Sequence, residues 1–102
     1  MIDNLLTLAD LDRIIHEPSR IMIVAILHHL ESADFLYLRR ETGLTQGNLS
    51  THLMKLEKAG YIQIEKTFRG KIPRTMCSLT EKGRQAFETY RQTLKIIYGN
   101  EV

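Results

Sequence analysis

The segment from Gly43 to Gly60, GLTQGNLSTHLMKLEKAG, constrains the fold of this chain more than any other part of the sequence. Thr45 is of a residue type that caps helix N-termini, while Gly43 and Gly60 suit the left-handed positions that end helices. The pattern predicts one short helix that ends at Gly43, a turn, and a second helix over about 46–58 that ends at Gly60.

The predicted helix over 46–58 has two contrasting faces. At about 100° per residue, Leu49, Leu53 and Leu56 fall on a narrow inner arc that can pack on a core. The opposite arc consists of Gly47, Asn48, Thr51, Met54, Lys55 and Lys58, with Gln46, Ser50 and His52 at its edges. The one acid near this arc is Glu57, at its flank. Any surface helix has a polar face, but these side chains are the types that bond base edges and phosphates. The face therefore favours a helix that lies in the major groove of DNA.

Gly47 lies in the first turn of this predicted helix. Glycine there costs roughly 1 kcal/mol of helix stability relative to alanine. Close approach of the helix backbone to DNA is one gain that would justify this cost.

The N-terminal third predicts two helices. Apolar residues between Leu5 and Ile15 recur at near-helical spacing, so we expect a helix over about 4–16. Pro18 suits the first turn of a second helix, over about 18–31, which is apolar nearly all round, as expected of a buried central helix. We then expect a loop at 32–34, a short strand at Phe35 and a short helix over 36–42.

The C-terminal half predicts a hairpin and a last helix. Tyr61–Phe68 and Ile72–Leu79 are rich in residues that favour strands, and Arg69, Gly70 and Lys71 between them predict a turn. Thr80 caps a helix over about 81–98, whose apolar stripe comprises Ala86, Phe87, Tyr90, Leu94, Ile97 and Tyr98. The sequence therefore predicts a single domain over 1–102 of class α+β, mainly α, with a two- or three-stranded β-sheet and extra N- and C-terminal helices.

Positive charge is concentrated in the middle of the chain. Residues 1–34 contain six acidic and two basic side chains. Residues 35–75 contain three acidic and eight basic side chains, and residues 76–102 contain three acidic and four basic ones. The net charges of these segments are −4, +5 and +1, which together give the +2 of the chain. A basic segment that coincides with the predicted outer helix face and hairpin is what a DNA-binding surface requires.

Several function classes lack the residues that they need. The sequence contains no activated nucleophile, paired carboxylates, phosphate loop or cofactor motif, so we expect neither an enzyme nor a cofactor. His16, His28 and His29 are not spaced to share a metal, and we expect Cys77 to be a small core residue, with a redox-sensing thiol as the alternative. No apolar run approaches the roughly 18–20 residues of a membrane span, and the N-terminus lacks the features of a signal peptide. We therefore expect a cytoplasmic protein without membrane contact.

Three segments of the chain match motifs of one superfamily. The segment 45–62, TQGNLSTHLMKLEKAGYI, resembles the recognition helix of MarR- and ArsR-type winged helix-turn-helix transcription regulators. The segment 70–84, GKIPRTMCSLTEKGR, resembles their wing return strand with the start of the next helix. The segment 16–27, HEPSRIMIVAIL, resembles their second helix. The pattern SxHLxxLExAGxI at 50–62 joined to LTxKG at 79–83 is fairly specific as a pair. The resemblance covers about 10–90. It implies a homodimer that places a recognition helix in each of two successive major grooves, with wings that reach the minor groove.

The resemblance also implies which residues contact double-stranded DNA. On the recognition helix, contacts to bases and nearby phosphates fall on Gln46, Asn48, Thr51, His52 and Lys55, and phosphate contacts on Thr45 and Ser50. On the wing, over 66–75, they fall on Arg69, Lys71 and Arg74, with Arg69 the best candidate for the minor groove. The chain is shorter than most MarR members and lacks the cysteine-rich metal motif of many ArsR sensors. Effector sensing is therefore not carried over from the resemblance.

The terminal helices carry more apolar surface than one small core needs. We expect 4–15 and 86–98 of two chains to form a dimer interface, which would place the two recognition helices about 34 Å apart. Packing of both stripes within one chain is the alternative.

The alternative function is a winged helix that docks on another protein without specific DNA binding. A docking face should expose large apolar or aromatic side chains, whereas 46–58 exposes only Met54.

Overall fold

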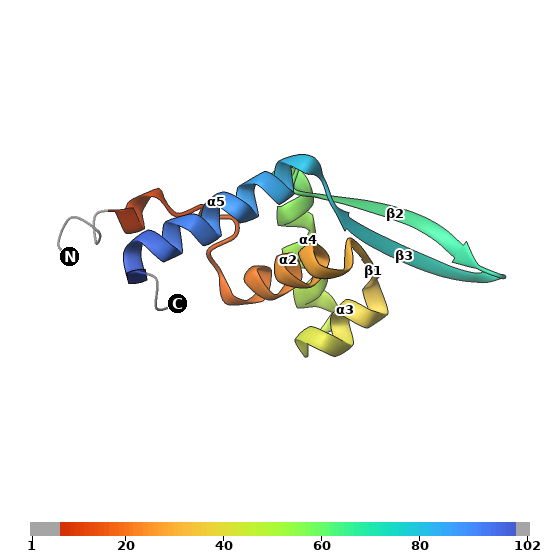
Figure 1. Cartoon of the computed structure of the whole chain (residues 1–102). Helices are drawn as coiled ribbons and strands as arrows, with labels where there is room; N and C mark the ends of the chain where they lie inside the picture. The colour runs from red at the N-terminus through yellow and green to blue at the C-terminus, as the bar shows by residue number, and fades with distance from the viewer. Residues whose placement is uncertain (1–6, 100–102) are drawn as a thin grey trace.

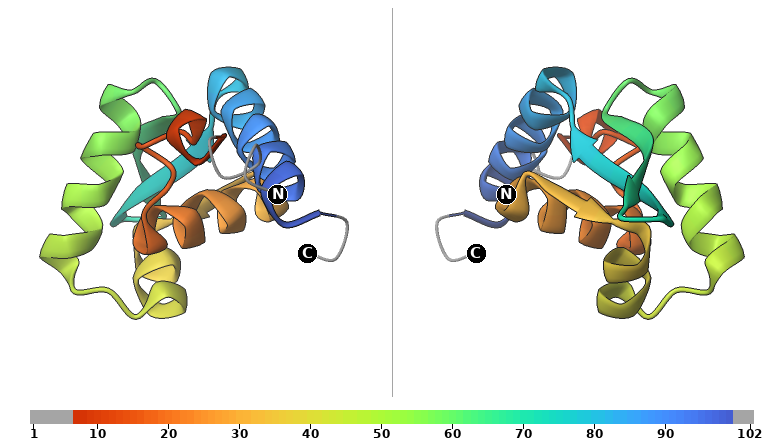
Figure 2. Two further views of the ribbon diagram at one scale, coloured as in Figure 1. Left: turned by 90° about the vertical axis from the view of Figure 1, so that its left-hand side faces the viewer. Right: turned by 90° about the vertical axis from the view of Figure 1, so that its right-hand side faces the viewer.

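The computed structural model describes residues 7–99 and shows a helical body from which a β-hairpin projects (Figure 1). In chain order its elements are the 3-10 helix η1 (Thr7–Asp10), α2 (Pro18–Leu30), β1 (Ser32–Asp34), α3 (Phe35–Thr42), α4 (Gln46–Lys58), β2 (Ile62–Arg69), β3 (Ile72–Leu79) and α5 (Glu81–Tyr98). This arrangement confirms the predicted α+β winged helix-turn-helix fold. α4 and α5 lie on opposite sides of the body (Figure 2), and the hairpin of β2 and β3 forms the wing.

α2 is the central helix, as predicted. Ile23, Val24 and Leu27 are completely buried and belong to a core that includes side chains of α3, α4, α5 and the sheet. Met22 and Leu30, by contrast, are 39% and 42% exposed. The helix is therefore buried on one face, although its sequence is apolar nearly all round.

The three strands form an antiparallel sheet in the order β1-β3-β2. β2 and β3 pair along their whole length, from Ile62 opposite Leu79 to Arg69 opposite Ile72. The turn between them is therefore Gly70 and Lys71 alone, and Gly70 has a φ of 65°, as the first position of a type II′ turn requires. The prediction of a three-residue turn is wrong for Arg69, which completes β2 by pairing with β3.

Residues 32–34 form a strand, so the predicted loop is wrong. They pair with 76–78 of β3, and Ala33 is buried in the core. The strand predicted at Phe35 is also wrong, because Asp34 caps α3 by accepting the N–H of Tyr37 at 2.7 Å. That bond places Phe35 in the first turn of the helix.

The N-terminal segment departs most from the prediction. Of the helix expected over 4–16, residues 4–6 lie outside the described residues, and 7–16 contain only η1. The Asp12 carboxylate accepts the N–H groups of Ile14 and Ile15 at 2.8 and 3.1 Å, and it also accepts the hydroxyl of Tyr61. Such bonds offer the backbone an alternative to helical pairing. Ile15 is nevertheless completely buried, so this apolar side chain reaches the core from an irregular segment.

α5 joins the body at its first half and extends beyond it, with η1 beside it (Figure 1). Its bounds confirm the prediction, and Thr80 caps it by accepting the N–H of Gly83 at 3.0 Å. Phe87 and Tyr90 are buried against the body. Within residues 7–99, no helix has both the length and the apolar character needed to cross a membrane.

Candidate nucleic-acid interface

α4 packs on the body with one face and exposes the other. Leu49, Leu53 and Leu56 are at most 2% exposed, as their spacing predicts. Thr45 begins the helix by accepting the N–H of Asn48 at 3.2 Å. The residues of the predicted outer arc are all exposed, together with Gln46: Gly47, Asn48, Thr51, Met54, Lys55 and Lys58. The outer face of α4 is therefore open along the whole helix.

Gly60 ends α4, as predicted. Its φ is +82°, its N–H donates to the carbonyl of Glu57 at 2.9 Å, and the N–H of Tyr61 donates to the carbonyl of Leu56 at 2.9 Å. These two bonds form a Schellman motif. Gly43 ends α3 in the same left-handed region, with a φ of 70°. Gly60 therefore ends α4 at the predicted place, and Gly43 ends the helix before it.

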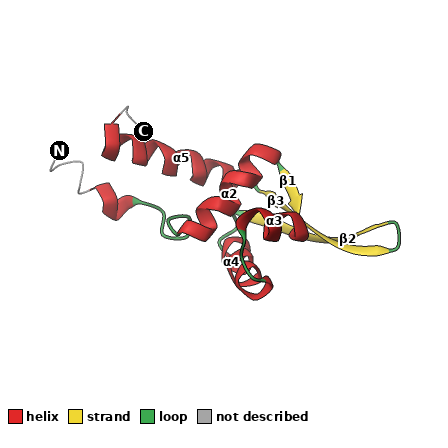
Figure 3. Ribbon diagram, turned by 90° about the horizontal axis from the view of Figure 1, so that it is seen from below, coloured by secondary structure: helices red, strands yellow, loops and turns green. Residues whose placement is uncertain are grey.

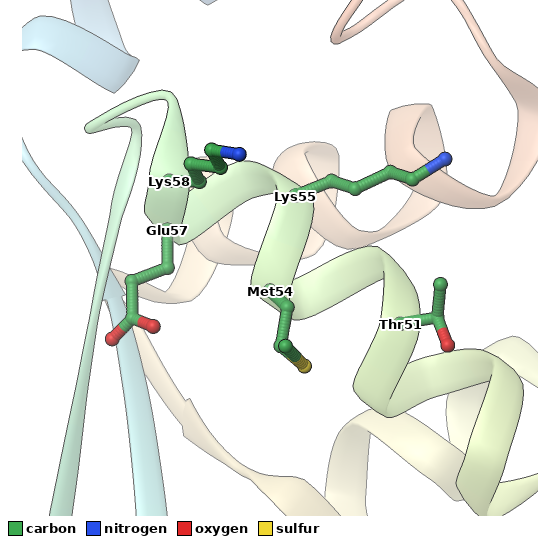
Figure 4. Close-up of a pocket in the computed structure, with 5 residues that line it drawn as sticks. All are labelled: Thr51, Met54, Lys55, Glu57 and Lys58. Atoms are coloured by element: carbon green, nitrogen blue, oxygen red, sulfur yellow. The ribbon is translucent and has the colours of Figure 1, made fainter.

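The outer face of α4 has a crest, which we define as Gly47, Thr51, Met54 and Lys58. These residues follow the spacing i, i+4, i+7 and i+11, so they form one line along the helix on the side opposite the leucines. The hydroxyl of Thr51 donates to the carbonyl of Gly47 at 3.0 Å. Part of the crest borders a shallow hollow of about 430 Å³ (Figure 4), which is lined by Thr51, Met54, Lys55, Glu57 and Lys58.

His52 lies at the edge of this face and is held by α2. Its Nδ1 is 3.0 Å from Nη1 of Arg20, a residue that is only 8% exposed and that also donates through Nε to the carbonyl of Ile14. A guanidinium has donors but no acceptor, so Nδ1 of His52 accepts, and the proton of the neutral ring lies on Nε2. The Nε2–H of His52 is therefore the donor that this ring can offer to a ligand.

Glu17 completes the cluster beneath α4. Its carboxylate caps α2 by accepting the N–H groups of Ser19 and Arg20 at 3.1 and 3.0 Å, and it lies 3.5 Å from Nδ1 of His52. Partial burial raises the pKa of Glu17, but the two N–H donors and the charge of Arg20 outweigh this effect and hold that pKa below its usual 4.5. The sequence prediction did not include this cluster. Its one local signal was a charged pair at the start of an otherwise apolar helix.

The basic residues of the wing occupy two places. Arg69 and Lys71 are exposed at its end. Arg74 lies nearer the body, and its Nε is 3.7 Å from the carboxylate of Asp34, the cap of α3. That carboxylate offsets part of the charge of Arg74. Arg69 and Lys71 are therefore the more accessible cations of the three.

The candidate residues fall on two separate surfaces. The exposed side of α4 carries Thr45, Gln46, Asn48, Thr51 and Lys55, with Ser50 and His52 half-buried at its edges. Arg69 and Lys71 lie at the end of the wing, in a molecule that measures 56 Å along its longest axis. Figure 3 shows that α4 and the wing point in different directions. A ligand that contacts both surfaces must be extended, as a DNA duplex is.

Comparison with known proteins shows the family. The family model described as winged helix DNA-binding domain matches residues 19–98. The chain belongs to this family. An uncharacterized protein of Methanocaldococcus jannaschii is 39% identical to it over 79 residues, which cover 76% of this chain and 85% of that protein.

Solved structures of transcription regulators share the winged-helix fold. A transcriptional regulator homologue from Pyrococcus horikoshii OT3 matches with a TM-score of 0.85 at 27% identity, over 98% of this chain and 99% of that one. A MarR family regulator from Neisseria meningitidis matches with a TM-score of 0.56 at 16% identity, over 99% and 70% of the two chains. An ArsR family transcriptional regulator matches with a TM-score of 0.56 at 15% identity, over 100% and 97%. These findings confirm the likeness in fold to MarR- and ArsR-type regulators, and the family model with the Pyrococcus structure supports a DNA-binding regulator.

Two histidines of this winged-helix domain have partners that join separate elements. Nε2 of His28 lies 2.9 Å from the carboxylate of Glu88, which links α2 to α5. Nδ1 of His16 lies 2.8 Å from the hydroxyl of Tyr90. Across residues 7–99, no three side chains of His, Cys, Asp or Glu are grouped so that they could hold a metal ion.

Cys77 is completely buried on β3, which confirms its prediction as a core residue. Burial, and then the negative charges of Glu57 and Asp34, raise the pKa of its thiol to about 11. Cysteine reacts as the thiolate, and this pKa keeps the thiol protonated at neutral pH. Cys77 therefore packs as a small apolar side chain.

Proposed function

We propose that this chain is a sequence-specific transcription regulator that binds double-stranded DNA with α4 in the major groove. The outer face of α4 carries this proposal, because it is exposed along the whole helix and its crest contains no acid. Glu57, the acid at its flank, lies on the side of β2 (Figure 4). A major groove about 12 Å wide admits a helix of this kind.

In this proposal the first turns of α4 read the base sequence. Gln46 and Asn48 are exposed there, and amide side chains can bond the N6 and N7 positions of adenine in bidentate fashion. Thr51 lies one turn further along the same side of the helix. Contacts of this type distinguish one base pair from another, so these residues would determine the sequence preference.

Other residues of α4 would position the duplex. Phosphate contacts would come from Thr45, Ser50 and Lys55; such contacts carry no sequence information but fix the register of the complex. His52 would donate its Nε2–H to a phosphate oxygen or a base acceptor. Its ring is already oriented by Arg20, so little conformational entropy is lost on binding.

The wing would extend the contact along the duplex. Arg69 and Lys71 at its end, with Arg74 nearer the body, would bind the phosphate backbone or the minor groove. The two-residue turn keeps the end of the wing short, so Arg69 would enter a narrow minor groove only shallowly.

The proposal includes a homodimer formed through 4–15 and 86–98. Ile96 and Tyr98 of α5 are 55% and 58% exposed, and pairing of two chains would remove this apolar surface from water. A two-fold axis near α5 would place the two α4 helices about 34 Å apart, one turn of DNA. Such a regulator acts where the DNA is, so we place it in the cytoplasm. Sedimentation equilibrium tests the dimer, since Ile96→Glu should give monomers, and a monomeric unmodified protein would contradict the proposal.

DNA binding tests the proposed function itself. The protein is titrated into duplexes selected from a random pool and into scrambled duplexes, at roughly 50 to 200 mM salt. We expect a clear preference for the selected duplexes and a strong salt dependence. Lys55→Ala should reduce the salt slope by about one, whereas Lys82→Ala, which removes the same charge from the exposed first turn of α5, should not. Asn48→Ala should relax the preference at particular base pairs. A protein that does not distinguish selected from scrambled duplexes would contradict sequence-specific binding.

The competing function, docking on a protein partner, has less support. A protein-docking face typically exposes aromatic and large apolar side chains at its centre. Among the residues of α4, Met54 is the one large apolar side chain that is exposed, at 65%. The remaining exposed residues of the helix are small, polar or charged.

A further inference from the structure

Met54 is an apolar side chain on the crest of a helix that is otherwise polar on its outer side. It is 65% exposed, so the packing of this chain does not account for a large apolar residue at this position. Figure 4 shows the side chain in the hollow between Glu57, on the side of the strands, and Thr51. The crest thus presents apolar surface at its middle, where a groove-bound helix lies closest to the bases.

Thr51 adds to this apolar surface. Its hydroxyl proton is committed to the carbonyl of Gly47 at 3.0 Å, so Thr51 has no donor left for a base. It precedes Met54 by three residues, which makes the two side chains neighbours on the helix surface. The methyl group of Thr51 and the thioether of Met54 can therefore contact a single apolar group.

Gly47 allows the crest to approach that group closely. A Cβ built at this position meets nothing within 4 Å, so the chain itself does not require the glycine. Without a side chain there, the helix can lie deeper in a groove over its first turn. Lys55 leads away from Met54 (Figure 4), so its ammonium group can reach a phosphate while Met54 stays over the base edges.

The major-groove edge of DNA contains one apolar group, the C5-methyl group of thymine. With α4 in the major groove, as the proposed function requires, we propose that Thr51 and Met54 recognise a thymine through apolar contact with this methyl group. Met54 is then a specificity-determining residue that reads a base without a hydrogen bond.

Deoxyuridine provides a test at the level of one methyl group, because it lacks the C5-methyl group and keeps every donor and acceptor of thymine. Thymines of a duplex selected by the protein are replaced one at a time, and affinities are measured by fluorescence anisotropy. We expect one or two replacements to weaken binding roughly fourfold, which corresponds to about 0.8 kcal/mol for one buried methyl-sized group. The other replacements should change the affinity little.

Two variants of Met54 assign the effect to this residue. Met54→Gln keeps the length of the side chain but makes its end polar, so it should bind the thymine duplex more weakly and should not distinguish thymine from deoxyuridine at the sensitive position. Met54→Leu stays apolar and should retain the discrimination. The side chain is exposed, so both variants should unfold at the temperature of the unmodified protein.

The outcomes separate this inference from the proposed function. If selected duplexes are preferred but no thymine is sensitive, or if Met54→Gln keeps the full discrimination, the methyl contact is wrong and the DNA-binding function stands. If no duplex is preferred at all, both fail. A protein-docking role for Met54 predicts this absence of any preferred duplex.

Discussion

The first turns of α4 and α5 are built alike but face different surroundings. Each follows a threonine cap, Thr45 or Thr80, and each contains a glycine, Gly47 or Gly83. A Cβ at Gly83 would lie 2.0 Å from the carbonyl oxygen of Tyr61, whereas a Cβ at Gly47 would meet nothing within 4 Å. Internal packing therefore explains the glycine of α5 and leaves the glycine of α4 without an internal reason. Gly83 thus allows the start of α5 to pack closely on the rest of the protein, and we infer that Gly47 allows a ligand to approach the start of α4.

Replacing Gly83 with alanine should have the largest effect. The added methyl group would collide with backbone atoms of Tyr61, so the free energy of unfolding should fall by about 3 kcal/mol, although alanine is the better helix former. Urea unfolding measures this loss. Ala86→Gly, one turn further along α5, is the control and should cost about 1 kcal/mol through helix propensity. A loss at Gly83 no larger than that at Ala86 would contradict the close contact.

Loss of the cap of α5 should destabilise the protein more than loss of the cap of α4. The hydroxyl of Thr80 accepts the N–H of Gly83 at 3.0 Å and donates to the carbonyl of Gly60 at 2.6 Å, whereas the hydroxyl of Thr45 makes one exposed bond, at 3.2 Å, to the N–H of Asn48. Thr80→Ala should therefore lower the free energy of unfolding by about 2 kcal/mol and Thr45→Ala by about 0.5 to 1 kcal/mol. Parallel urea titrations compare them, and equal losses would mean that the second bond of Thr80 contributes little.

Gly47→Ala should stabilise the protein, whereas Gly83→Ala should destabilise it. Alanine fits the open space around this position, so the free energy of unfolding should rise by up to about 1 kcal/mol. Affinity for selected DNA should fall at the same time, because the new methyl group stands on the surface proposed to approach the duplex. Thermal unfolding and anisotropy titrations on the same samples test both effects. A more stable protein with unchanged affinity would show that Gly47 has no role in binding.

The cap of α2 depends on pH, unlike the caps of α4 and α5, and its loss should have the smallest effect on stability. Glu17 caps this helix with a charged group, and its pKa is held below 4.5 in the folded protein. Its contribution should therefore be complete above pH 4.5 and be lost as the pH falls through the folded pKa. The threonine caps of α4 and α5 do not titrate. The stability difference between the protein and Glu17→Gln should shrink in acid by less than about 1 kcal/mol, and a difference that is constant with pH would contradict the prediction.

The sequence predicted α4 well because its signals are local. The cap at Thr45, the stop at Gly60 and the spacing of the inward leucines act within the helix or at its ends, and the structure confirms each of them. The open outer face follows from the same periodicity. Which of its residues contact DNA is still a prediction.

Local reasoning failed where a side chain competes for the backbone or where a distant strand pairs with it. The near-helical spacing that ends at Ile15 resembles that of a true helix, but Asp12 bonds the next N–H groups and the hydroxyl of Tyr61. Residues 32–34 have no strong strand signal, yet they pair with β3. The distant partners, Tyr61 and β3, could not be inferred from a window of neighbouring residues.

By itself, the sequence determined which residues of α4 face inward and which face outward, because helical periodicity is a property of the backbone. The tertiary structure decided what each face meets. His52 lies against Arg20, 32 residues away in the chain, and Gly83 lies against Tyr61. Both contacts exist because α2, α4, α5 and the sheet share one core, and no local pattern records where such distant segments meet.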